Sequence, residues 1–416
     1  MKNKNDVLLS VEHLCQYFRL NHKDFKAVDD ISFDIKKGEV FGLVGESGCG
    51  KTTTGRSIIK LYDITSGNIY FNGVRIAAGI RSYKDKISSL KKELKSKQKE
   101  LKENKISLEE FNLAKENIIK EIDLQKIEIL KAKHDTKNVD KEYALHQVNI
   151  VKEKYEKLFF STNDLEQIEN LKKEMKKEIQ IAKKSKIVTS IQMIFQDPIG
   201  SLNPRMTVSE IISEGLIVKG VKDKKYIKKR VDEVLELVGL VKEHASRYPH
   251  EFSGGQRQRI GIARSIIMEP TMIIADEPVS ALDVSIQAQV INLLNELRDK
   301  LGLTILFIAH DLSVVKYFSD RIGVMYFGKM VELASSDELF AHPLHPYTKS
   351  LLSAIPLPDP EYEKKRIRVT YNPVVMHDYT IDKPSMREIS KGHFVYCNDK
   401  EELEYKKELS KKWIKW

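Results

Sequence analysis

One glycine-rich stretch limits what this chain can fold into more than any other: Gly45-Glu46-Ser47-Gly48-Cys49-Gly50-Lys51-Thr52. It matches the phosphate-binding loop pattern of Gly, four free positions, Gly, Lys and Ser or Thr. Residues 40–44 form a short apolar run that predicts a buried parallel strand, and residues 53–59 can continue as a helix. The pattern therefore predicts an α/β fold in which a strand, a loop and a helix cradle a polyphosphate.

The expected chemistry of this loop follows from three glycines and two side chains. Gly45, Gly48 and Gly50 let backbone N–H groups and the helix N-terminus face the phosphates. Lys51 is expected to reach the β- and γ-phosphates, and the Thr52 hydroxyl to bind magnesium. A glycine-rich turn without a ligand is the alternative, but the correct flanking strand and helix disfavour it.

A second motif, which is acidic, supplies the carboxylate that a P-loop requires for magnesium. Residues 272–277 form an apolar run that ends in Asp276 and Glu277. Asp276 is expected to hold magnesium, commonly through water, and Glu277 to position and deprotonate the attacking water. The alternative, in which both acids merely cap a loop, is weak beside a complete P-loop.

Charge, cysteines and hydropathy restrict the class of protein further. The net charge of +10 is spread along the 416 residues, so it does not by itself indicate nucleic-acid or membrane binding. Cys15, Cys49 and Cys397 lie too far apart for a disulfide framework or a zinc site, which favours a reducing compartment. Residues 1–6 are not followed by a signal-peptide core. The run at 303–309 is far shorter than the roughly 18 residues that span a bilayer, so any membrane role must come through a partner.

The composition changes abruptly in the middle of the chain. Residues 80–197 contain no glycine or proline, and residues 81–190 include 47 charged side chains, which is helix-forming composition. Apolar residues recur at heptad spacing, with polar interruptions: Ile87, Leu94, Leu101, Leu108, Ile122 and Ile129 in one register, and Leu90, Phe111 and Ile118 in the other. The spacing predicts an imperfect coiled-coil hairpin over 80–187 with its tip at 134–140. A capping box at 107–110 indicates that one helix stops and restarts there.

The remaining segments alternate strands and helices. Turn-punctuated strands are expected over 7–76, and little structure is assignable beyond about 336. Between them the pattern predicts a strand at 191–195, helix at 207–240, a helix end and buried strand at 266–275, a strand at 303–309 and a strand pair at 321–333.

Four further motifs stand in a fixed order around these acids. Gln196 follows a strand, and the segment Ser253-Gly254-Gly255-Gln256 precedes a helix start. Ser280-Ala281-Leu282-Asp283 follows the acidic pair, and His310 ends the next strand. This ordered set resembles the ATP-binding subunits of ABC transporters.

Further residues narrow the resemblance to one type of subunit within that family. Gln256 and Val279-Ser280 favour the F-type ATP-binding subunit of oligopeptide permeases over its D-type sister. Residues 344–348, Leu-His-Pro-Tyr-Thr, resemble the extension shared by oligopeptide, dipeptide and nickel importers. The segments that carry the F-type match are 192–198, 201–207, 248–256 and 276–289, and the resemblance covers roughly 7–79 and 190–360.

The resemblance implies how ATP and magnesium are held. Subunits of this kind pair head to tail, so Ser253 and Gly255, within the signature 253–256, would donate hydrogen bonds to ATP on the partner's P-loop. Phe18 would stack on adenine, with Tyr17 as the alternative. The expected ATP contacts within the loop are Gly45, Glu46, Ser47, Gly48, Cys49, Gly50, Lys51, Thr52 and Thr53; magnesium would be held by Thr52, Gln196 and Asp276.

Four side chains receive catalytic or interface roles from the same resemblance. Glu277 would act as the base, and His310 would contact the γ-phosphate and steady Glu277. Gln196 would sense magnesium and link the site to the permease, while Asp283 would cross the dimer interface. Relatives often carry a C-terminal cysteine cluster suited to an iron–sulfur centre; only Cys397 stands there, so no cluster is expected.

The predicted organisation is a RecA-like P-loop NTPase core of ABC type with an N-terminal antiparallel β subdomain. The expected parts are a nucleotide-binding domain at 6–335, interrupted by the hairpin at 80–187, a helical signature subdomain at 198–257 and a C-terminal extension at 336–416.

The predicted function is ATP hydrolysis that powers oligopeptide uptake at the cytoplasmic side of the cell membrane. The expected partners are a D-type second ATP-binding subunit, two transmembrane permease subunits and an extracytoplasmic peptide-binding protein, with no nucleic acid. The alternative is a soluble ABC ATPase that acts on chromosome or ribosome through its coiled coil. It is disfavoured because the coiled coils of the chromosome class follow the glutamine loop, whereas this insertion precedes Gln196. Translation factors of this kind carry two cassettes per chain, whereas each motif occurs once here.

Overall fold

The computed structural model describes residues 6–160, 165–197, 200–355 and 369–410. The chain divides into two compact units, each described by itself. The first comprises residues 1–7, 35–59 and 188–416, and the second comprises residues 8–34 and 60–187. No helix in the described part of the chain is both long enough and apolar enough to cross a bilayer.

The second unit is built on a four-stranded sheet in the order β2-β1-β4-β5. The strands β1 and β2 are joined at Asn21 and His22, which both have positive φ, as tight turns require. β4 pairs antiparallel with both β1 and β5, as expected of a turn-punctuated antiparallel subdomain. The strands are β1 (Val7–Leu20), β2 (Lys23–Lys36), β4 (Ser66–Phe71) and β5 (Val74–Ile80).

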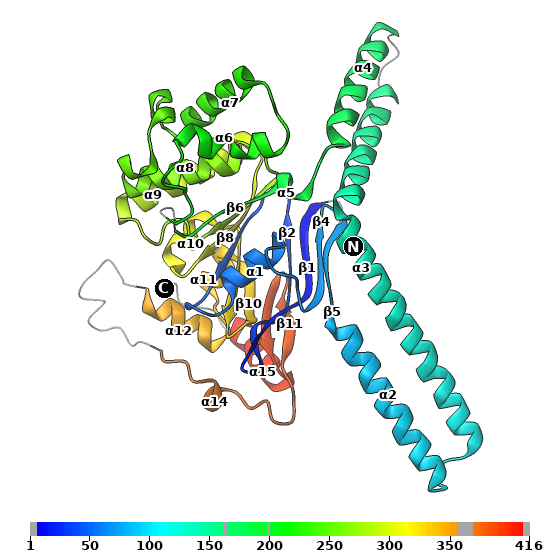
Figure 1. Cartoon of the computed structure of the whole chain (residues 1–416). Helices are drawn as coiled ribbons and strands as arrows, with labels where there is room; N and C mark the ends of the chain where they lie inside the picture. The colour runs from blue at the N-terminus through cyan, green and yellow to red at the C-terminus, as the bar shows by residue number, and fades with distance from the viewer. Residues whose placement is uncertain (1–5, 161–164, 198–199, 356–368, 411–416) are drawn as a thin grey trace. The chain divides into compact units, whose positions relative to one another are not determined.

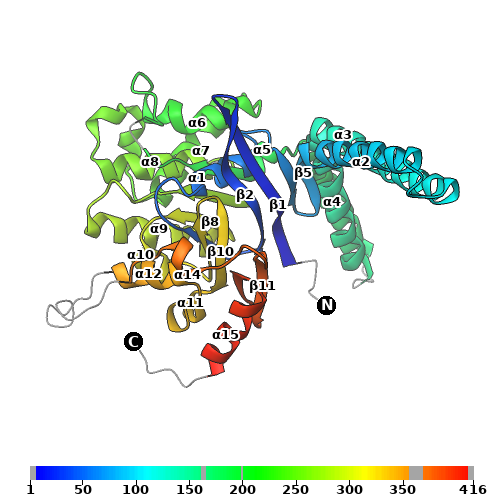
Figure 2. The same ribbon diagram turned by 90° about the horizontal axis from the view of Figure 1, so that it is seen from below.

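The predicted single hairpin with a tip at 134–140 is wrong. The segment forms α2 (Arg81–Lys102), α3 (Leu108–Phe160) and α4 (Leu165–Ala182), and 134–140 lies within the continuous helix α3. α2 runs beside the first part of α3 and α4 beside its last part (Figures 1 and 2). The insertion therefore makes two successive helix pairs that share one long helix.

The first turn falls at the capping box that the sequence indicated. Glu110 N donates to Ser107 Oγ at 3.1 Å, and Ser107 N donates to Glu110 Oε2 at 2.9 Å. The contact between α2 and α3 buries Leu90, Ile118 and Ile122, which all belong to the predicted heptad registers. The sequence Thr162-Asn163-Asp164 also predicts a helix cap, but it lies outside the described residues.

The middle of α3 is not a tip because it covers the sheet of its own unit. Tyr143 is 3% exposed, and its ring lies 6.1 Å from that of Phe71 in β4. Arg75 of β5 forms an ion pair with Asp135 at 2.5 Å. Ala132 is fully buried. The polar residues between these positions form the outer face of the helix, which explains why this stretch has the composition of a loop.

The first unit contains an eight-stranded mixed sheet in the order β11-β12-β10-β9-β3-β8-β7-β6. The strands from β6 to β9, together with β3, pair in parallel, and the strands of the C-terminal extension continue the sheet in antiparallel pairs. The strands are β3 (Val40–Val44), β6 (Ile191–Ile194), β7 (Met272–Asp276), β8 (Thr304–Ala309), β9 (Arg321–Tyr326), β10 (Lys329–Ser335), β11 (Ser385–Ser390) and β12 (His393–Cys397).

Helices surround this sheet, and those of the signature subdomain are grouped at one end of it (Figure 1). Strands β3, β7 and β8 are buried along their whole length, which explains their near-continuous apolar sequences. The helices are α1 (Lys51–Ile58), α5 (Ile187–Ser190), α6 (Val208–Val218), α7 (Lys224–Leu237), α8 (Gly254–Ile266), α9 (Val284–Leu301), α10 (Leu312–Phe318), α11 (Ser336–Ala341), α12 (Pro346–Ala354), α14 (Pro373–Met376) and α15 (Asp399–Ser410), with short 3₁₀ turns at Lys242–Ser246 and Pro249–Glu251.

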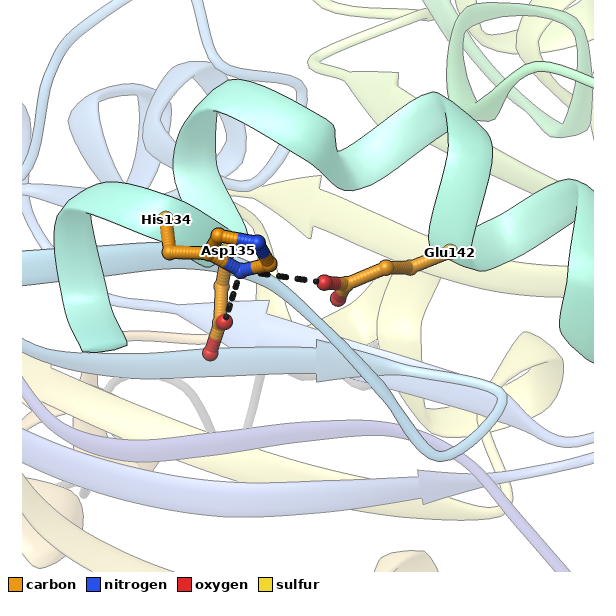
Figure 3. A group of neighbouring side chains, drawn as sticks. All are labelled: His134, Asp135 and Glu142. Atoms are coloured by element: carbon orange, nitrogen blue, oxygen red, sulfur yellow. Dashed lines mark hydrogen bonds and ion pairs between the residues drawn. The ribbon is translucent and has the colours of Figure 1, made fainter.

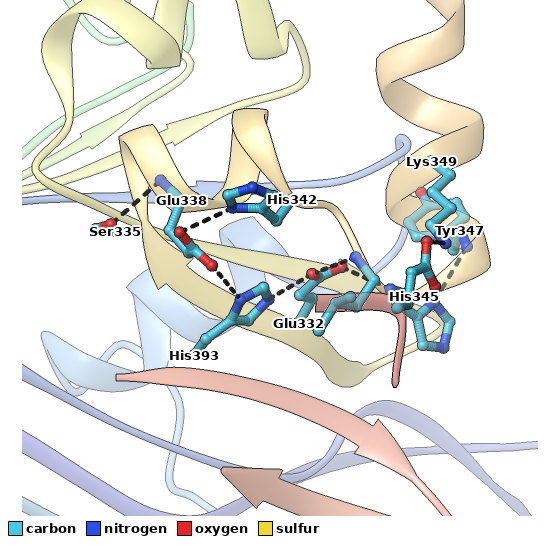
Figure 4. Close-up of polar contacts among 10 residues, drawn as sticks. Glu332, Ser335, Glu338, His342, His345, Tyr347, Lys349 and His393 are labelled. Atoms are coloured by element: carbon cyan, nitrogen blue, oxygen red, sulfur yellow. Dashed lines mark hydrogen bonds and ion pairs between the residues drawn. The ribbon is translucent and has the colours of Figure 1, made fainter. Parts of the chain in front are cut away.

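The C-terminal extension is more ordered than its sequence indicated. Glu332 on β10 and His393 on β12 are fully buried and form a hydrogen-bonded pair at 2.8 Å (Figure 4). Burial alone would lower the pKa of His393, but its hydrogen bonds to Glu332 and Glu338 raise that pKa above its ordinary value. Cys397 is also fully buried, and burial raises its pKa to about 12.

Replacing Tyr143 tests whether α3 is part of the core of its unit. Tyr143→Ala is expected to lower the free energy of unfolding by about 3 kcal/mol or more, because it removes a buried ring. Leu145→Ala on the same helix, where the side chain is 62% exposed, is expected to cost less than about 1 kcal/mol. Urea unfolding of the full chain measures both, and equal losses would contradict the packing of α3 on the sheet.

The His393–Glu332 pair predicts a pH dependence of stability. Because the folded-state pKa of His393 is raised, its contribution is complete below the unfolded pKa of about 6.5 and declines as pH rises through the folded value. The difference in free energy of unfolding between the wild type and His393→Gln should therefore shrink from about pH 6.5 upward. Urea unfolding at a series of pH values measures it, and a difference independent of pH would refute the pairing.

Candidate functional site

The P-loop lies between β3 and α1 with the geometry that its glycines permit. Gly45, Gly48 and Gly50 all have positive φ, of 147°, 80° and 105°. A Cβ on Gly45 would lie 2.2 Å from the Met325 carbonyl oxygen, so no larger residue fits there. Lys51 is 4% exposed, and its Nζ donates to the carbonyls of Gly45 at 2.7 Å and of Glu46 at 2.9 Å.

The threonine of the loop and the first acid of the β7 motif are in direct contact. Thr52 Oγ1 donates to Asp276 Oδ1 at 2.8 Å. Asp276 is fully buried, and burial raises its pKa. Its Oδ2 has no hydrogen-bond partner among the described residues. A hydroxyl beside a buried carboxylate with an unused oxygen is a suitable ligand set for a divalent cation.

Glu277 brings three predicted catalytic residues together. Its backbone N–H donates to Ile308 O at 2.9 Å, which ties it to β8. Its Oε2 accepts a hydrogen bond from Gln196 Nε2 at 3.0 Å and lies 3.2 Å from His310 Nδ1. The Glu277 side chain is 12% exposed and that of His310 is 54% exposed. The carboxylate is therefore held from both sides while remaining accessible to water.

The signature segment forms a helix N-terminus. Ser253 caps α8 through a reciprocal pair with Gln256: Gln256 N donates to Ser253 Oγ at 3.3 Å, and Ser253 N donates to Gln256 Oε1 at 3.0 Å. A Cβ on Gly255 would lie 2.6 Å from Ile286 Cγ2, so α8 and α9 approach closely there. The residue Ser253 is exposed, and so is its neighbour Gly254.

Asp283 and the two aromatic candidates have local partners in the structure. Asp283 caps α9 by accepting a hydrogen bond from Ile286 N at 3.0 Å, which lowers the pKa of its carboxyl. Phe18, in the second unit, has an edge-to-face contact with Tyr62. The Tyr17 hydroxyl donates to Asp29. The roles of Asp283 at an interface and of Phe18 or Tyr17 at adenine stay predictions.

Tyr347 is a site residue to which the sequence assigned no role. Its hydroxyl accepts a hydrogen bond from Glu46 N of the P-loop at 3.0 Å. It lies in the segment 344–348, so the motif itself was recognised. Its contact with residues 301 positions earlier is visible only in the folded chain.

Another group of possible metal ligands lies on α3. His134 Nδ1 is 3.4 Å from both Asp135 Oδ1 and Glu142 Oε1 (Figure 3). Asp135 already pairs with Arg75, and the His134 side chain is 65% exposed. The ion pair between Asp135 and the mostly buried Arg75 connects α3 to β5. We therefore assign this cluster a structural role.

The fold and this site define a P-loop nucleotide-binding protein. A family model described as "ABC transporter" matches residues 28–158 and 157–280, and one described as "Oligopeptide/dipeptide transporter, C-terminal region" matches residues 331–378. The chain belongs to the ABC transporter family, to its ATP-binding subunits of the oligopeptide-permease F type.

Curated relatives cover nearly the whole chain. It is 48% identical over 397 residues to the oligopeptide transport ATP-binding protein OppF of Bacillus subtilis, which covers 95% of this chain and 98% of that protein. It is 40% identical to the oligopeptide transport ATP-binding protein AmiF of Streptococcus pneumoniae over 98% of this chain and the full length of AmiF. The dipeptide transport ATP-binding protein DppF of Lactococcus lactis is 42% identical over 92% of this chain and 91% of DppF.

Two glycines of the loop provide a matched test of its packing. Gly45→Ala is expected to lower the free energy of unfolding by about 3 kcal/mol or more, because its Cβ meets the Met325 carbonyl as well as straining the backbone. Gly48→Ala meets open space and is expected to cost only the left-handed strain, about 1 kcal/mol. Denaturant unfolding of both variants checks the order, and a Gly48 cost equal to that of Gly45 would contradict it.

Proposed function

We propose that this chain is the ATP-hydrolysing subunit that powers oligopeptide uptake through a membrane ABC importer. The observation that carries the proposal is Glu277, held by Gln196 and His310 beside a P-loop. The same chain carries the C-terminal region of oligopeptide and dipeptide transporters. The names of its relatives, which cover nearly its whole length, support peptide transport as the process served.

The residues around the P-loop fit an ATP–magnesium complex. Lys51 and the loop amides would bind the phosphates, with Phe18 on adenine. Thr52 and Asp276 would hold magnesium, together with Gln196, and the unused Asp276 Oδ2 supports this assignment. Magnesium bound there would neutralise charge on the phosphate oxygens.

Glu277 would orient the attacking water and accept its proton. Its low exposure and its contacts with Gln196 and His310 would hold the carboxylate in one position. His310 would in addition reach the γ-phosphate. Through its hydrogen bond to Glu277, Gln196 would link the site of hydrolysis to the permease.

The exposed signature at the start of α8 favours a site shared by two subunits. A helix N-terminus with an exposed serine offers donors to an anion. Ser253 and Gly255 would therefore bind the γ-phosphate held by a second, D-type ATP-binding subunit, with Asp283 at the same interface. Two transmembrane permease subunits would place the pair at the cytoplasmic face of the membrane, and an extracytoplasmic binding protein would select the peptide.

A soluble ABC ATPase that acts on chromosome or ribosome is not favoured. The helical insertion packs on the β-sheet of its own unit through Tyr143 and Asp135. The relatives bear transport names over nearly the whole chain. Each observation favours a transporter subunit.

Glu277→Gln in the assembled transporter tests the proposal. The variant is expected to bind ATP within about twofold of wild type yet to lose hydrolysis and peptide uptake by at least about 100-fold, because the amide cannot accept the proton of water. Glu296→Gln, on the exposed face of α9, is the control and should leave both rates unchanged. The measurements are ATP affinity, phosphate release and uptake of labelled peptide into vesicles.

Two results would overturn this assignment. Undiminished hydrolysis by Glu277→Gln would show that the Glu277 carboxylate is not the catalytic base. If the wild type hydrolysed ATP but took up no peptide, the ATPase activity would be supported and the assignment of peptide as the transported substrate would be refuted.

A further inference from the structure

The P-loop is held from outside by one tyrosine of the C-terminal extension. Tyr347 lies in the first turn of α12, is 1% exposed, and accepts a hydrogen bond from Glu46 N at 3.0 Å. Its ring centre is 4.4 Å from that of Tyr326 and 5.5 Å from that of Tyr371. The surrounding rings fix the position of the hydroxyl oxygen.

The start of α12 is capped by the residue that precedes it. His345 is the N-cap, and its Nδ1 accepts a hydrogen bond from Tyr347 N at 3.1 Å. Burial lowers the pKa of His345 to about 3, so the imidazole stays neutral and can act as this acceptor. Pro346 occupies the first helical position, where its fixed φ suits the helix.

A buried glutamate connects this helix start to the sheet. Glu332 on β10 accepts hydrogen bonds from Leu344 N at 2.8 Å and His345 N at 3.0 Å, and pairs with His393 on β12 (Figure 4). Glu332 and His393 are both fully buried. Tyr347 is therefore mounted on the sheet and not on a free loop.

The P-loop needs such a support because its glycines make it costly to order. A backbone of Gly45, Gly48 and Gly50 loses more conformational entropy on fixing than one of other residues. Lys51 Nζ now holds the carbonyls of Gly45 and Glu46. When Lys51 turns to phosphate, as the proposed function requires, those two contacts end, whereas the bond from Glu46 N to Tyr347 does not depend on Lys51.

We propose that Tyr347 is a positioning residue: through its hydrogen bond to Glu46 N, the C-terminal extension keeps the P-loop ordered for nucleotide and so raises nucleotide affinity. This role rests on the proposed function, because it acts only if the P-loop binds ATP. It gives the extension a part in the ATP site of its own chain.

Tyr347→Phe removes the hydroxyl and keeps the ring. In the full chain, the dissociation constant of a fluorescent ATP analogue is expected to rise about three- to tenfold. The assembled transporter should show a raised KM for ATP and an unchanged kcat. Tyr371→Phe is the matched control, because its ring packs in the same cluster; its affinity should stay within about twofold of wild type.

Hydrogen exchange at the Glu46 amide gives a direct second readout. In the nucleotide-free wild type this amide should exchange slowly, and in Tyr347→Phe it should exchange at least about tenfold faster. An unprotected Glu46 amide in the wild type overturns the proposal even where the variant fails to fold. Equal affinity losses in Tyr347→Phe and Tyr371→Phe, or none in either, also overturn it.

These outcomes are distinct from failure of the proposed function. A wild-type chain that binds no ATP analogue would contradict ATP binding itself. If the Glu46 amide were nevertheless protected, its hydrogen bond to Tyr347 would be supported, but the proposed effect of that bond on nucleotide affinity would be refuted.

Discussion

The close approach of Gly45 to the backbone of β9 is the constraint on which this site depends. β3 lies between β8 and β9, and its last residue, Val44, pairs with Ala309 on one side and Val324 on the other. The chain then turns directly against the Met325 carbonyl, where only glycine fits. The carboxyl ends of parallel strands meet at one edge of the sheet, so the loop, the acids of β7 and His310 converge there.

The convergence explains how residues distant in the sequence share one site. Asp276 ends β7 and contacts Thr52 at the start of α1. Glu277 follows with a positive φ of 45° and is held by a backbone bond to β8. Residues in such strained conformations cluster at functional sites, and the Glu277 side chain contacts Gln196 and His310.

The C-terminal extension shows a similar dependence on the sheet. Its strands β11 and β12 continue the sheet beyond β10, so the extension shares one sheet with the nucleotide site. The buried Glu332 satisfies two backbone amides and one imidazole, which is the condition under which a buried charge is tolerated. The same glutamate fixes the start of the helix that carries Tyr347.

Local sequence was sufficient wherever the chemistry sits in consecutive residues. The P-loop, its flanking strand and helix, the capping box of Ser107, and the buried strands all follow from patterns within about ten residues. The contact between Thr52 and Asp276 agrees with the prediction that both would hold one magnesium ion. Such features are set by backbone preferences and side-chain chemistry that act at short range.

Contacts between distant segments were decided only by the tertiary structure. The polar run 134–140 has the composition of a turn, yet it is helical because Ala132, Val139 and Tyr143 on the other face of α3 are buried. The extension forms strands because β10 offers an edge with which β12 pairs, and Tyr347 meets Glu46, 301 positions away, only in the folded chain. Burial and edge pairing are properties of the assembled chain, which no local pattern in the sequence contains.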